Sequence, residues 1–438
     1  MRGAYTLLWW LALPFLPLRL WWRGRREPTY RRAIGERFGR YSQSRRDDRP
    51  LLWIHAVSLG ETRGAAPLVE RILRERADAA VLLTHMTASG REAGRALFGD
   101  RVVQAWLPYD VPFAVERFLA HFRPRAGLLV ETELWPNLVA GAKARGVPLY
   151  LVNARLSERS ARGYARIGGA ARAMFGALAG VVAQTDADAR RFATLGAHEP
   201  VVGGNLKFDV AAPAPLIERG RALRHRFGAR DVLVLASTRE GEEALLVDAL
   251  RRAALPPSVL VVIVPRHPQR FADVAALLDA RAVAFVRRTD ERAVPAATRV
   301  VLGDSMGEMF AYYAAADVVF VGGSLLPLGG QNLIEPIAAG APTLIGPHTF
   351  NFAQASEAAV ASGAAQRVAD ADEVFAAAQR LLADAPARER MRACGEAFLA
   401  AHRGATERLW TWLAPRLRGS PLATIPATCD SLPRDPAR

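Results

Sequence analysis

The sequence predicts two doubly wound α/β domains, each built on a parallel sheet with helices on both faces. Short apolar runs of strand length alternate with stretches of helical periodicity along most of the chain, a pattern typical of such sheets. At 438 residues the chain is too long for one ordinary hydrophobic core. The alternation breaks over residues 205–220, where Pro and Ala replace it. We therefore expect a first domain over residues 23–210 and a second over 211–419.

In the first domain, a strand is expected to lead directly into a helix. Residues 51–56 are apolar, and Ala65, Leu68, Val69 and Ile72 then recur at the spacing of one helix face. The same reading predicts further strands at 80–84, 102–107, 127–131, 148–152, 180–184 and 200–203, and then at 232–236, 258–264, 283–287, 299–302, 317–321 and 342–345. Ligands of open parallel sheets bind outside the carboxyl ends of the strands, so we expect a site there, in the cleft between the domains.

The first 22 residues predict an uncleaved membrane anchor. An apolar stretch from Ala4 to Leu18 is interrupted by Pro14 and Pro17 and is followed by tryptophans and a dense run of arginines. It falls short of the roughly 20 apolar residues that a spanning helix needs, so the segment either inserts or lies in the inner leaflet. The arginine flank would hold the rest of the chain on the cytoplasmic side of the inner membrane. A buried core helix is the alternative. At the other end, residues 420–438 have little apolar content and predict a disordered tail.

The net charge of +15 favours an anionic partner: nucleic acid, anionic lipid or an acidic substrate. The densest arginine cluster adjoins the anchor, and no signature of a nucleic-acid-binding fold is present. This favours anionic lipid and argues against nucleic acid. The two cysteines, Cys394 and Cys429, show no metal-binding spacing. Two Asp-Ala-Asp triplets, at 186–188 and 370–372, are explained by helix capping, so neither a metal nor a cofactor is expected.

The best-formed candidate site in the second half is "GGSLLPLGGQNLIEP", residues 322–336. A strand leads into a glycine-rich loop, and a helix opens near Asn332, an arrangement that suits a phosphate group. Glu335 falls in the first turn of that helix, where its carboxylate can accept hydrogen bonds from a ribose diol or simply complement the helix dipole. Arg266 and His267 follow another strand end, where a guanidinium can reach a phosphate or a carboxylate.

In the first half, Glu61 stands where the strand over 51–56 meets its helix. An acid in a first helical turn complements the helix dipole, which is one explanation for it and which would depress its pKa. A carboxylate at the rim of a sheet, within reach of a bound hydroxyl, can also act as a general base.

Nine stretches resemble, in order, the motifs of the 3-deoxy-D-manno-octulosonic acid (Kdo) transferases of lipopolysaccharide synthesis. They are HAVSLGE (55–61), ETELWPNL (131–138), NARLS (153–157), GNLKFD (204–209), STREGEE (237–243), VPRHP (264–268), GDSMGE (303–308), GGQNLIEP (329–336) and GPHTFNF (346–352). The resemblance extends from the N-terminus to about residue 410. It implies a membrane-anchored enzyme of the glycosyltransferase B fold. It also implies transfer of Kdo from CMP-Kdo to a lipid A precursor, lipid IVA, with inversion and without a metal.

The resemblance also implies roles for particular residues. Glu61 matches the general base of the family, and Glu131 and Lys207 match residues that stabilise the transition state. The segments that match the CMP-binding motifs comprise Pro265, Arg266, Met306, Gly307, Glu308, Met309, Asn332, Leu333, Ile334 and Glu335. The chain departs from the pattern at Gln331, where many relatives have His. The alternative function is that of another nucleotide-sugar enzyme of the same fold, a hexose transferase or an epimerase, which would share the glycine-rich loop.

Overall fold

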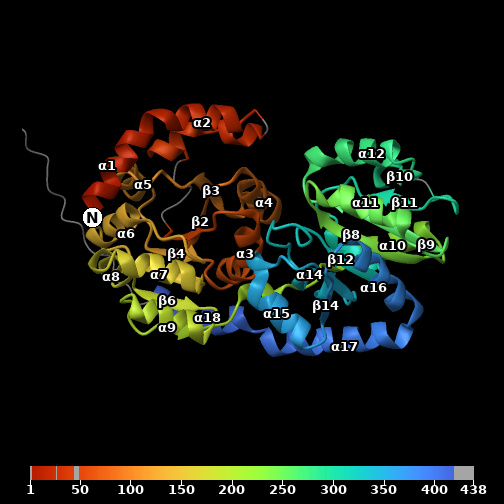
Figure 1. Ribbon diagram of the computed structural model, residues 1–438. Helices are drawn as coiled ribbons and strands as arrows, with labels where there is room; N and C mark the ends of the chain where they lie inside the picture. The colour runs from red at the N-terminus through yellow and green to blue at the C-terminus, as the bar shows by residue number, and fades with distance from the viewer. Residues whose placement is uncertain (1, 26, 44–48, 292, 419–438) are drawn as a thin grey trace, which may run out of the picture. The chain divides into compact units, whose positions relative to one another are not determined.

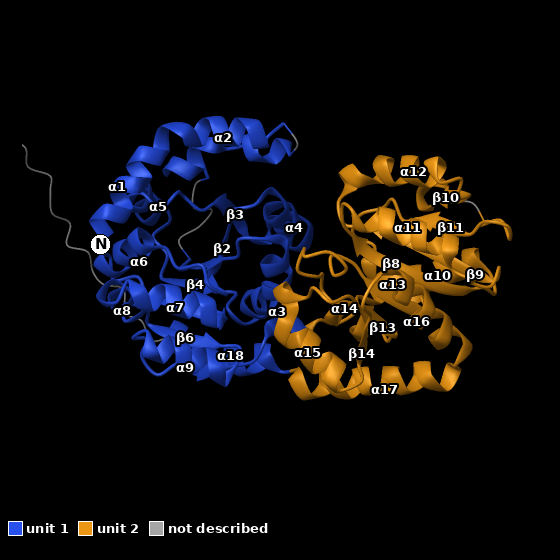
Figure 2. Ribbon diagram, viewed as in Figure 1, with its two compact units in different colours: residues 1–209, 404–438 blue, residues 210–403 orange. Residues whose placement is uncertain are grey.

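The computed structural model describes residues 2–25, 27–43, 49–291 and 293–418 and forms two compact units (Figures 1 and 2). Unit 1 comprises residues 1–209 together with 404–438, and unit 2 comprises residues 210–403. The predicted tail over 420–438 lies outside the described residues.

Unit 1 contains a parallel sheet of seven strands in the order β3-β2-β1-β4-β5-β6-β7. The strand order reverses between β1 and β4, which pair directly, and this switch point is where doubly wound sheets bind ligands. The bounds are β1 Leu51–His55, β2 Ala80–His85, β3 Val103–Trp106, β4 Ala126–Val130, β5 Leu149–Ala154, β6 Gly180–Ala183 and β7 Val201–Val202. Every strand predicted in this half is present.

The sheet of unit 1 is covered on both faces. Along β1, Leu51 and Trp53 join one hydrophobic core, and Leu52 and Ile54 join the other, as the alternation of side chains along a strand requires. The helices are α3 Leu59–Glu75, α4 Ala88–Phe98, α5 Pro112–Phe122, α6 Pro136–Ala144, α7 Glu158–Arg166, α8 Gly169–Phe175, α9 Asp186–Thr194 and α18 Ala405–Arg418. Two buried faces explain why the strands are continuous apolar runs.

Helix α18, the last in the described residues, packs on unit 1, so the prediction that residues 211–419 form the second domain is wrong for this helix. Leu409 and Trp410 share a core with α3, and the indole N–H of Trp410 donates to Glu75 at 2.6 Å. Asp209 accepts from the backbone N–H groups of Gly404 and Thr406, so the segments that leave and re-enter unit 1 are hydrogen-bonded to each other. Periodicity shows that a helix has an apolar face, but not which core that face covers.

Unit 2 contains a second parallel sheet of seven strands, in the order β10-β11-β9-β8-β12-β13-β14. Its strands are β8 Asp231–Thr238, β9 Val259–Pro265, β10 Phe285–Arg287, β11 Val300–Leu302, β12 Val318–Val321, β13 Thr343–Ile345 and β14 Ala365–Arg367. Its helices are α10 Ala214–Phe227, α11 Glu242–Arg252, α12 Phe271–Ala280, α13 Met309–Ala315, α14 Ile334–Ala338, α15 Ala353–Ala361, α16 Ala371–Ala383 and α17 Ala385–His402. The prediction of two parallel α/β sheets is confirmed; only the edge strand β14 was missed.

The N-terminal segment forms two short helices, α1 Arg2–Ala12 and α2 Leu16–Arg23, joined by a 3-10 turn over Leu13–Phe15. Leu16 and Leu20 pack against Tyr30 and Tyr109 of unit 1. Six large apolar side chains of this segment are at least 60% exposed: Leu7, Leu8, Leu11, Phe15, Leu18 and Trp22. Among the helices of the described residues, none has the length and apolar content needed to cross a bilayer.

Candidate active site

Three polar residues of unit 1 follow strand ends. Glu61 is the third residue of α3, shortly after β1, and Glu131 directly follows β4. Lys207 lies in a 3-10 turn over Leu206–Asp209, after β7. Because β1 and β4 are adjacent parallel strands, Glu61 and Glu131 lie at the same edge of the sheet, at its switch point.

Glu61 is held by the turn that precedes its helix. Its Oε2 accepts from the backbone N–H of Val57 at 2.8 Å, and its Oε1 accepts from the Ser58 hydroxyl at 2.8 Å. Ser58 is the N-cap of α3 and accepts from the Glu61 N–H in return. Glu61 therefore does take part in helix capping. Each carboxylate oxygen has a second lone pair, so these contacts leave it able to accept a proton.

Burial raises the pKa of Glu61 from its ordinary 4.5 to about 7. The negative charges of Glu131 and Glu133 act in the same direction, and the hydrogen bonds from Val57 and Ser58 oppose them. The expectation that the helix start lowers this pKa is therefore wrong, because desolvation of the carboxylate outweighs the hydrogen bonds that it accepts there. A carboxylate that titrates near neutrality is suited to general-base catalysis.

Lys207 pairs with Glu131 and lies beside α3, the helix that carries Glu61. Its Nζ lies 2.6 Å from Glu131 Oε1, and both side chains are largely buried. Its aliphatic chain covers Gly64 of α3, one turn beyond Glu61: a Cβ added to Gly64 would lie 3.3 Å from Lys207 Cγ. The structure thus brings the three predicted catalytic residues into one group within unit 1.

In unit 2, Arg266 is joined to the glycine-rich loop. Its backbone N–H donates to Thr238 O at 2.9 Å, and its Nε donates to Gln331 Oε1 at 3.1 Å. The Gln331 N–H in turn donates to Gly322 O. The residue that departs from the family pattern therefore orients the arginine that is predicted to contact CMP.

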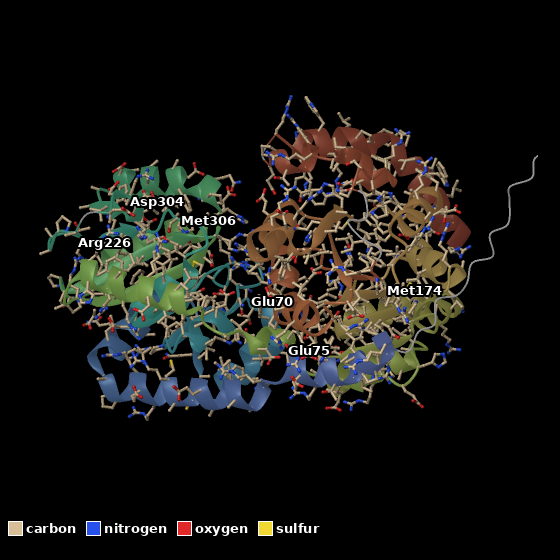
Figure 3. All side chains as sticks on the ribbon, turned by 180° about the vertical axis from the view of Figure 1, so that it is seen from behind. Glu70, Glu75, Met174, Arg226, Asp304 and Met306 are labelled. Carbon is tan, nitrogen blue, oxygen red and sulfur yellow. The ribbon has the colours of Figure 1, made fainter. Side chains whose placement is uncertain are left out.

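The segment over 306–309 presents backbone and one exposed side chain. Met306 (Figure 3) is 54% exposed, and Gly307 adopts a left-handed conformation. Glu308 is buried, and its carboxylate contacts Ser305, Arg219 and Arg288. The carboxylate of Glu308 thus holds this loop in place within unit 2.

The segment over 332–335 is partly structural. Asn332 Oδ1 accepts from the Ile334 N–H at 3.1 Å, while the side chains of Leu333 and Ile334 are buried. Glu335 is half-buried in the first turn of α14, a helix of five residues. Leu333 and Ile334 therefore contribute only their backbone to any nucleotide contact.

One residue with a clear part in this region was not among the predicted site residues. Glu242 is fully buried and accepts from the backbone N–H groups of Arg239, Gly323 and Leu325 at 3.0, 2.5 and 2.9 Å. Through these hydrogen bonds, Glu242 fixes the backbone at the start of the glycine-rich loop. The sequence signal was its place in STREGEE, directly after a buried strand.

Within the described ranges, the side chains of His, Cys, Asp and Glu form no group of three or more that could hold a metal ion.

Comparison with known proteins identifies the family. Residues 32–210 match the family described as 3-deoxy-D-manno-octulosonic-acid transferase (kdotransferase). The 3-deoxy-D-manno-octulosonic acid transferase of Bordetella pertussis is 48% identical over 422 residues, which cover 93% of this chain and 97% of that protein. The transferase of the same name from Haemophilus influenzae is 35% identical over 95% of this chain and 99% of that protein.

A solved glycosyltransferase from Rickettsia africae aligns with a TM-score of 0.58 at 10% identity, covering 86% of this chain and all of that one. At that identity the similarity concerns the fold alone, which agrees with two sheets of the glycosyltransferase B type. The ordered motifs, the two parallel sheets and the identity to these relatives lead to one conclusion: the chain belongs to the Kdo transferase family and is an enzyme.

Proposed function

We propose that the chain transfers Kdo from CMP-Kdo to the lipid A precursor lipid IVA, with inversion at the anomeric carbon and without a metal. The observation that carries the proposal is the group formed by Glu61, Glu131 and Lys207 at the switch point of the first sheet. It unites a carboxylate of raised pKa with a second carboxylate and a lysine.

In this proposal Glu61 is the general base. A hydroxyl of the acceptor attacks the anomeric carbon of Kdo, Glu61 takes its proton, and the bond from that carbon to the phosphate oxygen of CMP breaks. The electron pair of that bond leaves with CMP. Attack opposite the leaving group inverts the configuration.

Glu131 and Lys207 serve the transition state. Positive charge develops on the sugar ring as the bond to CMP lengthens, and a nearby carboxylate such as Glu131 stabilises it. The positive charge of Lys207 reduces the repulsion between the carboxylates of Glu61 and Glu131, and it can also attract the carboxylate of Kdo. On the nucleotide side, Arg266, oriented by Gln331, is suited to the phosphate of CMP. The ten residues that match the CMP-binding motifs of the family are assigned to CMP, and Glu335 among them is assigned to the ribose.

We further propose that α1 and α2 hold the enzyme on the cytoplasmic face of the inner membrane. The support is the exposed apolar side chains of this segment together with its arginines. Arg25 and Arg31 lie over the ring of Trp21, an aromatic residue of the kind enriched at membrane interfaces. Anionic lipid is thus the expected surface partner, and nucleic acid is not.

The test is product formation by the full-length protein in detergent, from CMP-Kdo and tetraacyl lipid A precursor, followed by mass spectrometry. We expect Kdo-bearing product, undiminished by EDTA, with the anomeric configuration opposite to that of the donor. Transfer from UDP-hexoses, but not from CMP-Kdo, would overturn the proposal. Retained configuration, or loss of activity with EDTA that a divalent cation restores, would overturn the corresponding part of the mechanism.

A further inference from the structure

The ion pair between Glu131 and Lys207 joins two segments that the sheet itself does not bring together. Glu131 follows β4, and the turn that carries Lys207 follows β7, the edge strand of the order β4-β5-β6-β7. To reach Glu131, this turn must cross the ends of β6 and β5. Strand pairing does not set its position, so other contacts must do so.

Asn153, near the end of β5, supplies such a contact. Its Oδ1 accepts from the backbone N–H of Leu206 at 3.0 Å, directly before Lys207. Val152, the residue before Asn153, contacts the other member of the ion pair: the backbone N–H of Glu131 donates to Val152 O at 3.0 Å. One end of one strand therefore contacts both segments of the ion pair.

The backbone is distorted to make this contact. Asn153 has φ +50°, and the register between β5 and β6 shifts between Leu151 and Ala154. Ala154 consequently lies in the same core as Leu149 and Leu151, which strict alternation would forbid. The irregularity redirects Asn153 toward Leu206, whose side chain packs in the opposite core.

The residue type suits this position. Asparagine tolerates a left-handed backbone better than most residues, and its short side chain presents a carbonyl oxygen. The side chain is 2% exposed, and Gln184 Nε2 donates to its backbone carbonyl at 3.0 Å. Left-handed non-glycine residues that tight surroundings enforce gather at functional sites, and Glu131 itself has φ +64°.

We propose that Asn153 is a positioning residue, which holds the turn of Lys207 so that Lys207 and Glu131 keep the geometry that transfer requires. The inference rests on the proposed function of this pair. It goes beyond that function because it assigns a role in catalysis to a residue of NARLS that need not touch either substrate.

The experiment compares Asn153→Gly with Asn153→Asp in the full-length enzyme. Asn153→Gly keeps the freedom to adopt a positive φ but removes the acceptor, whereas Asn153→Asp keeps an acceptor for the Leu206 N–H. We expect Asn153→Gly to lower kcat by about 10²-fold, the effect of displacing a reacting geometry by about 1 Å. Binding of CMP itself should stay unchanged, because the residues assigned to CMP belong to unit 2. Asn153→Asp should regain most of the lost kcat.

The matched control is Asn137→Ala. Asn137 is also buried in unit 1, but its side chain bonds Asp110 and Thr6. A general loss of stability should lower Tm in both variants, and only Asn153→Gly should lower kcat. Wild-type kcat in folded Asn153→Gly protein, an equal loss in Asn137→Ala, or no recovery in Asn153→Asp would each overturn the inference.

Two further measurements keep the inference testable whichever variant folds. In the wild-type protein, the amide of Leu206 should exchange slowly with solvent, and rapid exchange would overturn the contact directly. Glu131→Gln tests the foundation: unimpaired turnover would overturn both the role of Glu131 and this inference. Impaired Glu131→Gln beside unimpaired Asn153→Gly would overturn the inference alone.

Discussion

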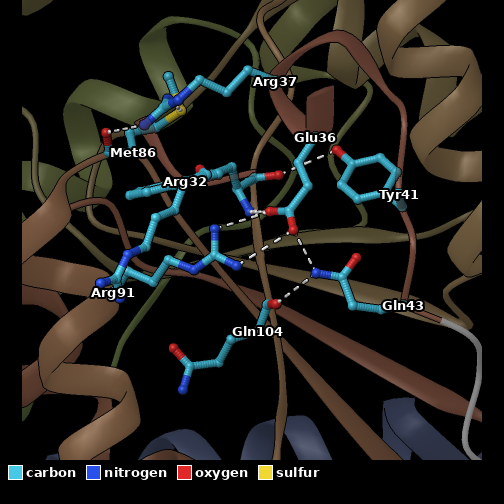
Figure 4. Close-up of polar contacts among 9 residues, drawn as sticks. Arg32, Glu36, Arg37, Tyr41, Gln43, Met86, Arg91 and Gln104 are labelled. Atoms are coloured by element: carbon cyan, nitrogen blue, oxygen red, sulfur yellow. Dashed lines mark hydrogen bonds and ion pairs between the residues drawn. The ribbon is translucent and has the colours of Figure 1, made fainter. Parts of the chain in front are cut away.

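Glu36 and Arg91 form a buried ion pair, with Arg91 Nη1 3.0 Å from Glu36 Oε2 and side chains that are 3% and 5% exposed (Figure 4). The remaining capacity of the carboxylate is taken by the Trp106 N–H at 2.7 Å and by Gln43 Nε2 at 2.5 Å. Glu36 follows the N-terminal helices in the sequence, Arg91 lies in α4 and Trp106 lies in β3. These contacts therefore attach the segment that follows α2 to α4 and β3.

We expect Glu36→Ala to destabilise unit 1 by about 3–5 kcal/mol, because it leaves Arg91 buried without its carboxylate. The control is Glu70→Ala. Glu70 (Figure 3) pairs with Arg101, and both side chains are about half exposed, so its loss should cost less than about 1 kcal/mol. Denaturant unfolding measures both. Similar losses in the two variants would show that burial does not decide how much an ion pair contributes to the stability of unit 1.

The strands were predictable because burial on both faces leaves a continuous apolar run, as in residues 258–264. Strand β14, Ala365–Arg367, lacks such a run. Among the described strands it lies at the edge of its sheet, beside β13, so few apolar residues are needed. The core against which α18 packs could not be predicted either, because an amphipathic period shows that a helix has an apolar face but not which core that face covers.

The candidate site was predictable as a set of residues, not as a geometry. Motif order identified Glu61, Glu131 and Lys207, but the route of the chain that brings Lys207 from β7 to Glu131 depends on contacts far apart in sequence. The raised pKa of Glu61 could not be predicted either, because it results from burial. Glu242 stayed unassigned since its three backbone partners come from two separate loops.

His55 and His85 should make unit 1 less stable as the pH drops below about 6.5, an effect that the raised pKa of Glu61 partly offsets. Burial lowers the pKa of His55 to about 3 and that of His85 to about 4, from an ordinary 6.5. The unfolded chain therefore binds protons in a range where the folded chain does not, so folding is disfavoured as the pH falls. Urea unfolding between pH 7.5 and 5 measures this. His85→Gln should flatten the dependence, whereas substituting the exposed His225 should not. If the stability of His85→Gln depended on pH as steeply as that of the wild type, the lowered pKa of His85 would not be its cause.

Replacing Leu7, Leu8 and Leu11 with Gln should weaken binding to vesicles that contain anionic phospholipid. These side chains are 60%, 67% and 63% exposed, so their loss should change folding stability little. Leu245→Gln, at an exposed apolar position of unit 2, is the control and should bind vesicles like the wild type. Co-sedimentation measures both. Full binding by the triple variant would place the membrane contact elsewhere.

Glu242→Gln should raise KM for CMP-Kdo. A carboxylate can accept from all three N–H groups that meet it, but an amide presents only one oxygen, so the loop from Gly323 to Leu325 loses a buried partner. Such a loss costs about 1–3 kcal/mol, and much of it should appear as weaker donor binding. Glu240, an exposed neighbour, provides the control variant Glu240→Gln. Unchanged KM in Glu242→Gln would show that the loop does not depend on this carboxylate.

Glu61→Gln should lower turnover by roughly 10²–10⁴-fold, the usual contribution of a positioned proton acceptor. CMP binding should persist, because the residues assigned to it lie in unit 2. In the wild type the base must be ionised, so the rate of single-turnover transfer should rise as the pH increases through about 7, the pKa of Glu61. The slower transfer by the variant should not show this rise with pH.

The capping role of Glu61 makes a different prediction, and stability separates the two. A folded-state pKa above the ordinary 4.5 means that ionising Glu61 opposes folding, so its contribution to stability is lost as the pH rises from about 4.5 to about 7. The neutral Glu61→Gln should then be at least as stable as the wild type at pH 8, although far less active. If capping were the main role, the variant would instead be destabilised, by about 0.3–1 kcal/mol, and its turnover would remain within a few-fold of the wild type. Unfolding and single-turnover transfer, measured on one preparation at pH 8, decide between these outcomes.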